Sequence, residues 1–384
     1  MDNFCLGPEI IYGDQGLGYL EQIDGKNIMI FTDKPMVRFG IVRNVEKIIE
    51  RKKIPYHIFS GVEPDPSIDV VKKGLAQFTK LKPDTLIAIG GGSVIDVAKA
   101  VLFFFIKIQK QFVDAKAVCR PMFIAIPTTS GTGSEVTSYS VVTDQANAAK
   151  VPLRDRMMIP DVAILDESLT QSVPPKVTAD TGMDVLAHAL EALVSRKSSV
   201  FTDMLAEKAI KMVFAYLPQA FHNGKDALAR RNLHLASCMA GIAFENASLG
   251  INHSLAHSIG ARYHLSHGRS NAILLPYVIA CNAGIYDGKV HQSKAARKYA
   301  EAAAWIGFGA ESTEQGVKNL IQAIKKLNKK LCLPVSLHET IIDKNIFEKN
   351  LPQITKVAMK DICTEGNPKK VSQKDLADIL KQAY

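Results

Sequence analysis

The distribution of apolar residues divides the chain into two parts with different periodicities. In the N-terminal part, short apolar runs bounded by turn residues alternate with stretches whose apolar residues recur at helical spacing. This alternation favours a mostly parallel, doubly wound sheet. The predicted strands are residues 9–12, 27–33, 56–62, the first part of 84–101, the first part of 122–138, and 161–167; the predicted helices are a segment ending near Gly25, one starting at Lys34, 45–53, 67–81 and the second part of 84–101.

From about Val177 onward, helical periodicity dominates and strand-like segments are nearly absent. The clearest predicted helices are residues 178–195, 202–217, 229–247, 294–307, 313–331 and 373–384. With 384 residues, the chain exceeds the size at which one hydrophobic core keeps growing. We therefore predict a Rossmann-like α/β domain over residues 1–178 and an all-α domain over residues 179–384.

The composition, with 47% hydrophobic and 22% charged residues, is that of an ordinary globular protein. The net charge is +9, but the lysines and arginines are scattered and no nucleic-acid motif accompanies them. We therefore expect the positive field to attract an anionic cofactor, and we expect no nucleic-acid partner.

The six cysteines are dispersed and form no CxxC pair, which indicates reduced thiols and a cytoplasmic location. The N-terminus lacks the basic-then-apolar order of a signal peptide. The longest apolar run, Val101–Ile106, is too short to span a bilayer. A soluble protein without a membrane partner is the expectation.

Histidines gather in one stretch, residues 241–268, which holds four of the ten. His253 and His257 are four residues apart, so on a helix they project from one face. Asp184 and His188 form a second pair at the same spacing in an apolar helical stretch. A single helical histidine is more often a hydrogen-bonded, half-buried residue than a ligand. Two such pairs favour a divalent transition-metal site built from two helices.

Two polar loops follow predicted strands in the N-terminal part. The first, Gly90–Ser93, turns a strand into a helix, where glycines let backbone N–H groups approach a phosphate at the helix N-terminus. The second, Thr128–Ser134, is rich in hydroxyl groups, as expected of a crevice that holds ribose or phosphate. Asp33 ends an early strand, where its carboxylate is placed to accept from a ribose diol and to oppose an NADP 2′-phosphate. It is equally a candidate helix N-cap, as is Ser67, and for Asp33 the two roles are compatible.

Four motifs together resemble the iron-dependent (group III) alcohol dehydrogenases: GGGSVIDVAKA, PTTSGTGSEVTSYSVVTD, DVLAHALEALVS and LGINHSLAHSIGARYHLSHG. The resemblance covers essentially the whole chain, down to DICTEGNPKK, and implies the dehydroquinate synthase-like fold of that family. Within the family the chain resembles the short-chain propanol dehydrogenases of propanediol-utilising bacterial microcompartments, which implies a dinucleotide-binding domain over residues 1–178 and a metal-binding and substrate domain over residues 179–384. Two positions depart from the family pattern: Lys369 stands where Arg is common, and Glu167 stands where Pro is common.

The resemblance changes the ligand assignment that spacing alone suggests. Spacing selects His253 and His257 as a pair, whereas the family pattern implies a metal held by Asp184, His188, His253 and His267. His257 is then implied near the nicotinamide, as a cofactor contact and catalytic proton relay. His264 keeps the ordinary interpretation of a surface or supporting residue.

The resemblance also implies further binding residues. Those implied at the dinucleotide are Asp33, Asp65, Gly91, Gly92, Ser93, Thr128, Thr129, Thr132 and Lys150. By sequence alone Lys150 is more simply a solvated loop lysine. The residues implied at the alcohol pocket are Tyr139, Phe244 and Cys363, each of which would otherwise be interpreted as a core or surface residue.

The implied reaction is hydride transfer between NAD(H), held across an interdomain cleft, and a small primary alcohol or its aldehyde. The metal would act as a Lewis acid on the substrate oxygen, and His257 would relay the proton. Iron(II) is what the resemblance implies, although ligand chemistry alone also accepts zinc(II).

The expected conversion is propionaldehyde to 1-propanol, which regenerates NAD. The same family resemblance leaves other substrates open: lactaldehyde or propanediol, 1,3-propanediol, ethanol and glycerol-type polyols. A lyase of the dehydroquinate synthase type would need a basic substrate pocket, whereas the expected pocket around Phe244 and Tyr139 is apolar. A non-catalytic microcompartment scaffold would not need complete sets of metal and cofactor ligands, so their presence counts against it. A homodimer is the default expectation. A microcompartment shell protein or an aldehyde dehydrogenase is a further expected partner, which would place the enzyme inside a microcompartment.

Overall fold

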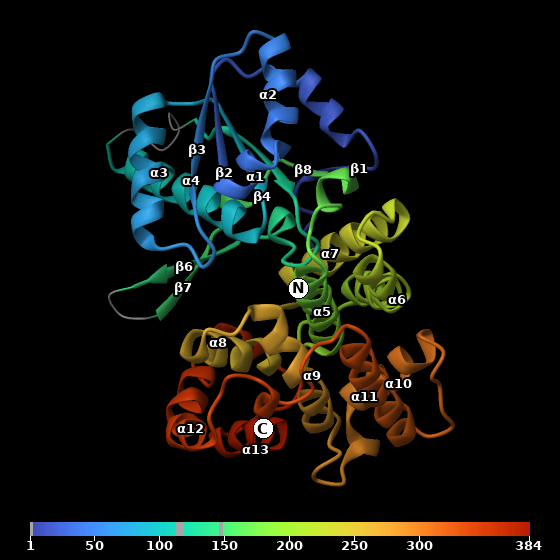
Figure 1. The fold of residues 1–384 in the computed structure, drawn as a ribbon. Coiled ribbons are helices and arrows are strands. Elements are labelled where there is room, and N and C mark those ends of the chain that lie inside the picture. Colours follow the sequence, from blue (N-terminus) through green and yellow to red (C-terminus); the bar gives the residue numbers. More distant parts are fainter. Residues whose placement is uncertain (1–2, 113–118, 146–148) are drawn as a thin grey trace. The chain divides into compact units, whose positions relative to one another are not determined.

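The computed structural model describes residues 3–112, 119–145 and 149–384, which form two units. One unit is Leu6–Ser172, and the other is Val173–Tyr384 together with the N-terminal residues through Cys5. The predicted boundary after residue 178 falls within a helix of the second unit. Figure 1 labels the elements of both units, which are described separately below.

The first unit is built on a six-stranded parallel sheet with the strand order β1-β8-β5-β4-β2-β3. Its order shows the crossovers of a doubly wound fold, as the alternation of strands and helices predicts. The strands are β1 (Glu9–Tyr12), β2 (Ile28–Asp33), β3 (Tyr56–Val62), β4 (Thr85–Gly90), β5 (Met122–Pro127) and β8 (Val162–Leu165).

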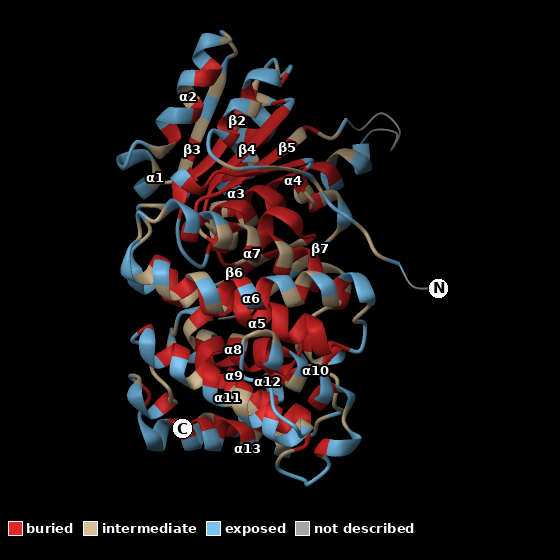
Figure 2. Cartoon of the chain, turned by 90° about the vertical axis from the view of Figure 1, so that its right-hand side faces the viewer, coloured by how far each residue is buried: buried red, intermediate tan, exposed pale blue. Residues whose placement is uncertain are grey.

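The central strands are buried on both faces, and alternate residues pack against different helices. One face carries Phe31, Leu86 and Phe123, which pack with α3 (Ile68–Leu81) and α4 (Gly92–Phe112). The opposite face carries isoleucines 30, 87 and 124, which pack with α2 (Ile41–Arg51) and the 3₁₀ segment η1 (Gly16–Gln22). Figure 2 shows buried residues concentrated in these strands.

The helix predictions for this unit hold with three corrections, the first being that α2 (Ile41–Arg51) begins four residues before the predicted 45–53 and ends two residues earlier. Asp33 caps α1 (Lys34–Arg38) and Ser67 caps α3, since each side chain accepts a backbone N–H of its helix. The segment predicted as a helix ending near Gly25 is instead the 3₁₀ element η1, because its two glycines weaken an α-helix. Helix α4 continues to Phe112, beyond the predicted end at residue 101.

A two-stranded antiparallel ribbon, β6 (Tyr139–Asp144) with β7 (Ala149–Arg154), was not predicted from the sequence. Tyr139 pairs with Arg154, and Thr143 pairs with Lys150. Pro152 lies within β7, where it lacks a ladder donor. Among the strands that the structure describes, β7 pairs only with β6, so its other edge forms no strand pairing and can accommodate Pro152.

The second unit consists of helices joined by loops, and its described residues contain no strand, as predicted. Its helices are α5 (Pro175–Val194), α6 (Val200–His222), α7 (Ala227–Ala247), α8 (Ile251–Tyr263), α9 (His267–Ala283), α10 (Lys294–Trp305), α11 (Thr313–Lys330), α12 (Lys344–Ala358) and α13 (Gln373–Ala383). Residues of α8, α9, α12 and α13 form one hydrophobic core. Helix α5 is buried almost throughout from Thr178 to its end, so its polar side chains lie in the interior. Among the described residues, no helix is long and apolar enough to cross a membrane.

Candidate functional site

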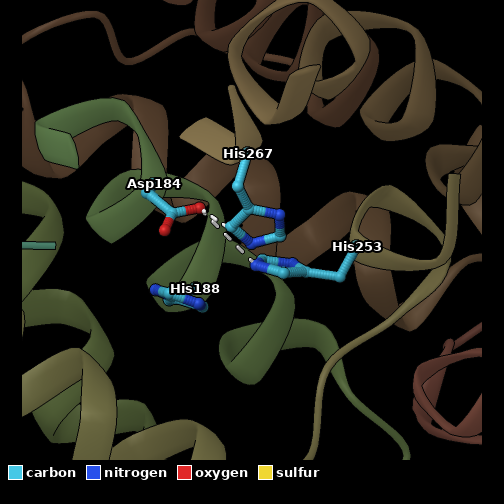
Figure 3. Close-up of side chains that lie close together, drawn as sticks. All are labelled: Asp184, His188, His253 and His267. Carbon is cyan, nitrogen blue, oxygen red and sulfur yellow. Dashed lines mark ion pairs between the residues drawn. The ribbon is translucent and has the colours of Figure 1, made fainter. Parts of the chain in front are cut away.

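Three helices of the second unit bring four potential metal ligands together. Asp184 and His188 project from one face of α5, as their spacing predicts, and His253 comes from α8. His267 is the first residue of α9. One ligand atom of each lies within 4.8 Å of the others, and Figure 3 shows the four side chains converging. We call these four residues the metal cluster.

The position of His267 depends on a close approach between α9 and α5. A Cβ at Gly268 would lie 1.9 Å from the backbone oxygen of Asp180, so only glycine permits this contact. The Asp180 carboxylate accepts from Ser266 Oγ at 2.7 Å and from the Arg269 guanidinium at 3.2 to 3.3 Å. The residues on both sides of His267 are therefore tied to α5, and its ring is directed at the cluster.

The electrostatics of the metal cluster suit a cation. Burial raises the pKa of Asp184 to about 8 and lowers the pKa of His253 well below its usual range, because neither charge is solvated there. The Asn271 amide nitrogen lies 2.6 Å from Asp184 Oδ1 and 3.2 Å from Nε2 of both His253 and His267. Its two N–H groups can serve only two of these three acceptors. A divalent ion fits this set better, because one carboxylate and three imidazoles are ligands of first-row metals.

Glu191, a residue that was not predicted from the sequence, contacts the ring nitrogen of His253 that faces away from the metal cluster. One of its oxygens is hydrogen bonded to His253 Nδ1, which leaves Nε2 for the metal cluster. The other accepts the backbone N–H of Asn252 at 2.8 Å, in the first turn of α8. Burial raises the pKa of Glu191 to about 8. Its position seven residues after Asp184 (191 − 184 = 7), two helical turns along the same face, is the signal that could have found it.

His257 lies outside the metal cluster and pairs with Asp361. Its Nδ1 is 2.8 Å from Asp361 Oδ2, and its ring stacks on His267 with centroids 5.2 Å apart. Burial raises the pKa of Asp361, but the hydrogen bond and charge of His257 outweigh it and bring the pKa to about 2. The ionised carboxylate accepts the Nδ1–H, which leaves Nε2 as the ring nitrogen not engaged with Asp361. Cys363 is buried beside this pair, and its backbone N–H donates to Asp361.

An apolar wall borders the metal cluster. The Phe244 ring stacks on His188 at a centroid distance of 4.5 Å, and Phe244 itself is buried. His188 in turn stacks on His253 at 4.5 Å. The sequence-predicted pocket residues Phe244 and Cys363 therefore both lie beside the histidines, whereas Tyr139 belongs to the other unit and stacks under Arg154. His264 is exposed and ends α8 in the left-handed conformation.

In the first unit, the two predicted nucleotide loops lie next to each other. Gly91 precedes α4, and Gly92 and Ser93 are its first residues. A Cβ at Gly92 would lie 2.6 Å from the Thr132 side chain, so a glycine is required where the two loops meet. A Cβ at Gly91 would lie 3.5 Å from Thr129 Oγ1, which is an ordinary van der Waals contact. The N-terminal N–H groups of α4 are thereby offered to an anion.

Buried polar groups support the second loop. Lys99 is fully buried, and its ammonium donates to Ser134 Oγ at 3.0 Å, to the Tyr139 carbonyl at 2.9 Å and to the Ser134 carbonyl. Thr128 Oγ1 is buried and has no hydrogen-bond partner among the described residues. A ribose or phosphate oxygen of a bound dinucleotide would pair this buried hydroxyl, so these residues fit the cofactor.

The remaining predicted cofactor residues occupy two places. The Asp33 carboxylate at the end of β2 accepts from Met36 N at 2.8 Å, and burial raises its pKa. Asp65 and Lys150 form an ion pair with each other at 2.7 Å. Lys150 is thus held by a carboxylate rather than simply solvated.

Comparisons with known proteins agree with this geometry. Residues 8–167 match the family model "Iron-containing alcohol dehydrogenase", and residues 178–384 match "Fe-containing alcohol dehydrogenase family, C-terminal". The chain is 40% identical to the NADPH-dependent butanol dehydrogenase of Clostridium saccharobutylicum, over 100% of this chain and 98% of that protein. It is also 40% identical to the 1-propanol dehydrogenase PduQ of Citrobacter freundii, over the full length of both. It spans 45% of the aldehyde-alcohol dehydrogenase of Streptococcus pneumoniae, again with 40% identity.

Solved structures show the same fold. A 1,3-propanediol oxidoreductase matches with a TM-score of 0.90 and 31% identity, over 100% of both chains. An iron-containing alcohol dehydrogenase from Thermococcus thioreducens matches with a TM-score of 0.89 and 32% identity, over 100% of this chain and 99% of that one.

Proposed function

Because the chain belongs to the iron-containing alcohol dehydrogenase family, we propose that it interconverts propionaldehyde and 1-propanol, with NAD(H) as cofactor and iron(II) at the metal cluster. The family assignment makes the chain an NAD(P)-dependent alcohol dehydrogenase, and it favours this activity over a lyase or a non-catalytic scaffold. The observation that carries the proposal is the convergence of Asp184, His188, His253 and His267 within 4.8 Å.

The residues of the metal cluster are proposed to hold the ion, which when bound supplies Lewis acidity to the substrate oxygen. Glu191 keeps the His253 ring oriented with Nε2 toward the ion. His257, held by Asp361, is proposed to relay the proton that leaves the alcohol or enters the product. Phe244 beside His188 supplies an apolar surface for a short alkyl chain.

The preference for NAD over NADP is proposed from Asp33. A carboxylate at the end of β2 accepts from a ribose diol and repels a 2′-phosphate. The butanol dehydrogenase relative is named as NADPH-dependent, so the two cofactors have to be compared directly.

The substrate proposal is tested on protein loaded anaerobically with iron(II), by following NADH consumption with propionaldehyde, butyraldehyde, acetaldehyde, lactaldehyde and 3-hydroxypropionaldehyde. We expect the highest kcat/KM with propionaldehyde and a loss of activity on removal of the metal. A clear preference for butyraldehyde would refute the propanol assignment while leaving the alcohol dehydrogenase assignment intact. Zinc(II) loading serves as the comparison metal.

The expected partners are proposed on the sequence resemblance alone. A homodimer is proposed as the working form, and encapsulation in a bacterial microcompartment with a shell protein or an aldehyde dehydrogenase is proposed for the cell. Light scattering of the purified protein tests the first, and fractionation of intact microcompartments tests the second. A monomer in the first experiment, or absence from the microcompartment fraction in the second, would contradict the corresponding proposal.

A further inference from the structure

A basic cavity in the helical unit has no role in the chemistry described above. Its volume is about 480 Å³, within the usual range of small-molecule sites. It is lined by the end of α5 and the residues after it, the end of α9, the start of α10, and the Pro368–Lys369 segment. None of its lining residues belongs to the metal cluster or to the His257–Asp361 pair.

Five cationic side chains line this cavity, against one carboxylate. The cations are Arg196, Lys289, Lys294, Lys298 and Lys369, and the carboxylate is Asp287. Two of the cations are already neutralised: Lys369 pairs with Asp287 at 2.9 Å, and Lys298 pairs with Asp203, which lies outside the lining, at 2.6 Å. Arg196, Lys289 and Lys294 form no ion pair within the described part of the chain. Three positive charges are therefore left around one hollow.

The start of α10 adds to this positive potential. Ser293 caps the helix by accepting from Ala296 N, but the first N–H groups of any helix have no partner within it. Lys294 and Ala295, the first two residues of α10, line the cavity. Together with the cationic side chains, this helix end favours a phosphate group in the cavity.

Hydrogen bonds hold part of the lining, so a ligand has to order mainly the exposed side chains of Arg196, Lys289 and Lys294. Asn282, which lines the cavity, exchanges two side-chain hydrogen bonds of 2.8 and 3.0 Å with Asn367. The Lys298 ammonium is held by the Leu193 carbonyl, Ser198 Oγ and Asp203. The backbone N–H of Arg196 donates to the Gly366 carbonyl at 2.9 Å, which fixes the backbone of this lining residue. Preorganisation of this kind lowers the cost of binding.

We propose that this cavity is a binding site for a polyphosphate chain, independent of the dinucleotide site in the other unit. Several cations around a hollow larger than one phosphate call for a ligand with several negative charges, and Arg with Lys is the combination that suits phosphate oxygens. No aromatic side chain lines the cavity, so no stacking surface for a base is present among its lining residues. The recognised group is thus the phosphate chain, whether it is inorganic or part of a nucleotide.

The test is calorimetric titration of the metal-loaded protein in saturating NADH, which keeps the cofactor site filled. The titrants are the magnesium salts of tripolyphosphate and ATP, with adenosine as the uncharged comparison; magnesium limits stripping of the bound metal. We expect tripolyphosphate and ATP to bind one site with similar affinity, adenosine not to bind, and affinity to fall with salt. Binding of ATP without tripolyphosphate, or affinity weaker than about 1 mM for both, would overturn the proposal.

A double variant locates the site. Arg196→Gln with Lys294→Gln removes two of the unpaired charges, and we expect at least about a tenfold loss of tripolyphosphate affinity. Lys329→Gln with Lys330→Gln is the matched control, because both lysines are exposed at the end of α11 and removing them changes the net charge equally. Thermal unfolding of each variant confirms that it is folded. An equal loss in both double variants would show general charge attraction and refute the cavity as the site.

Discussion

Glutamine in place of Glu191 tests the most specific geometric feature of the metal cluster. The carboxylate has two acceptor oxygens, and each is used: one by His253 Nδ1 and one by the N–H of Asn252. Glutamine has a single acceptor oxygen. If that oxygen stays with Asn252, the amide N–H₂ faces His253 and forces its proton onto Nε2, the nitrogen that the metal requires. If the amide is turned round, the N–H of Asn252 is left unpaired.

The magnitude follows from either arrangement. An unpaired buried donor costs about 1–3 kcal/mol. Loss of a carboxylate that orients a histidine ligand typically weakens metal binding about 10- to 100-fold, which corresponds to about 1.4–2.7 kcal/mol. The two estimates agree, so we expect the metal dissociation constant of Glu191→Gln to rise by one to two orders of magnitude.

Competition with a chromogenic chelator measures this constant for zinc(II) and cobalt(II), and the cobalt absorption spectrum reports the ligand geometry independently of activity. Glu301→Gln, at an exposed position of α10, is the matched control. Because burial raises the pKa of Glu191 to about 8, the metal-free protein already holds this carboxyl largely neutral at pH 7. Metal-free stability is therefore expected to change by less than about 1 kcal/mol. An unchanged dissociation constant and spectrum would refute the reasoning, and so would an equal loss in the control.

Three further predictions concern other residues. His267→Ala should abolish metal retention, whereas His257→Ala should slow turnover with metal still bound; equal metal loss by elemental analysis would show the assignment to be wrong. Asp33→Gly should shift the ratio of kcat/KM for NADH over NADPH at least about tenfold toward NADPH, and equal use of both cofactors by the unaltered chain would contradict the premise. Burial raises the pKa of Glu135 to about 7, so its contribution to stability is present below pH 4.5 and is lost as the pH rises to about 7. Glu135→Gln should remove this dependence and stabilise the protein above pH 7 by roughly 1–3 kcal/mol, measured by denaturant unfolding at pH 5 and pH 8; parallel pH profiles would contradict it.

The architecture of both units was largely predictable, because it depends on local periodicity. Strand β3 has the bounds that the apolar run at residues 56–62 indicated, and Asp33 and Ser67 cap the helices that follow them. The ribbon of β6 and β7 was missed because it is short, carries Pro152 and is held by contacts with segments distant in the sequence, such as the hydrogen bond from Val141 N to Asp96. Pairing between segments of that kind leaves no periodic signal in either one.

For the metal cluster, helical spacing was enough to identify the candidate residue types and two helices: Asp184 and His188 had to share a face, because four residues make about one helical turn. Spacing could not choose between His257 and His267; the family resemblance implied His267, and the packing of the helices gives the physical reason. Gly268 lets α9 approach Asp180, which brings His267 to the other three ligands, while Asp361 holds His257 apart from them. Glu191 likewise acquires its role only when α8 packs its first turn on α5. Spacing along one helix is a local property, whereas convergence of three helices depends on how they pack.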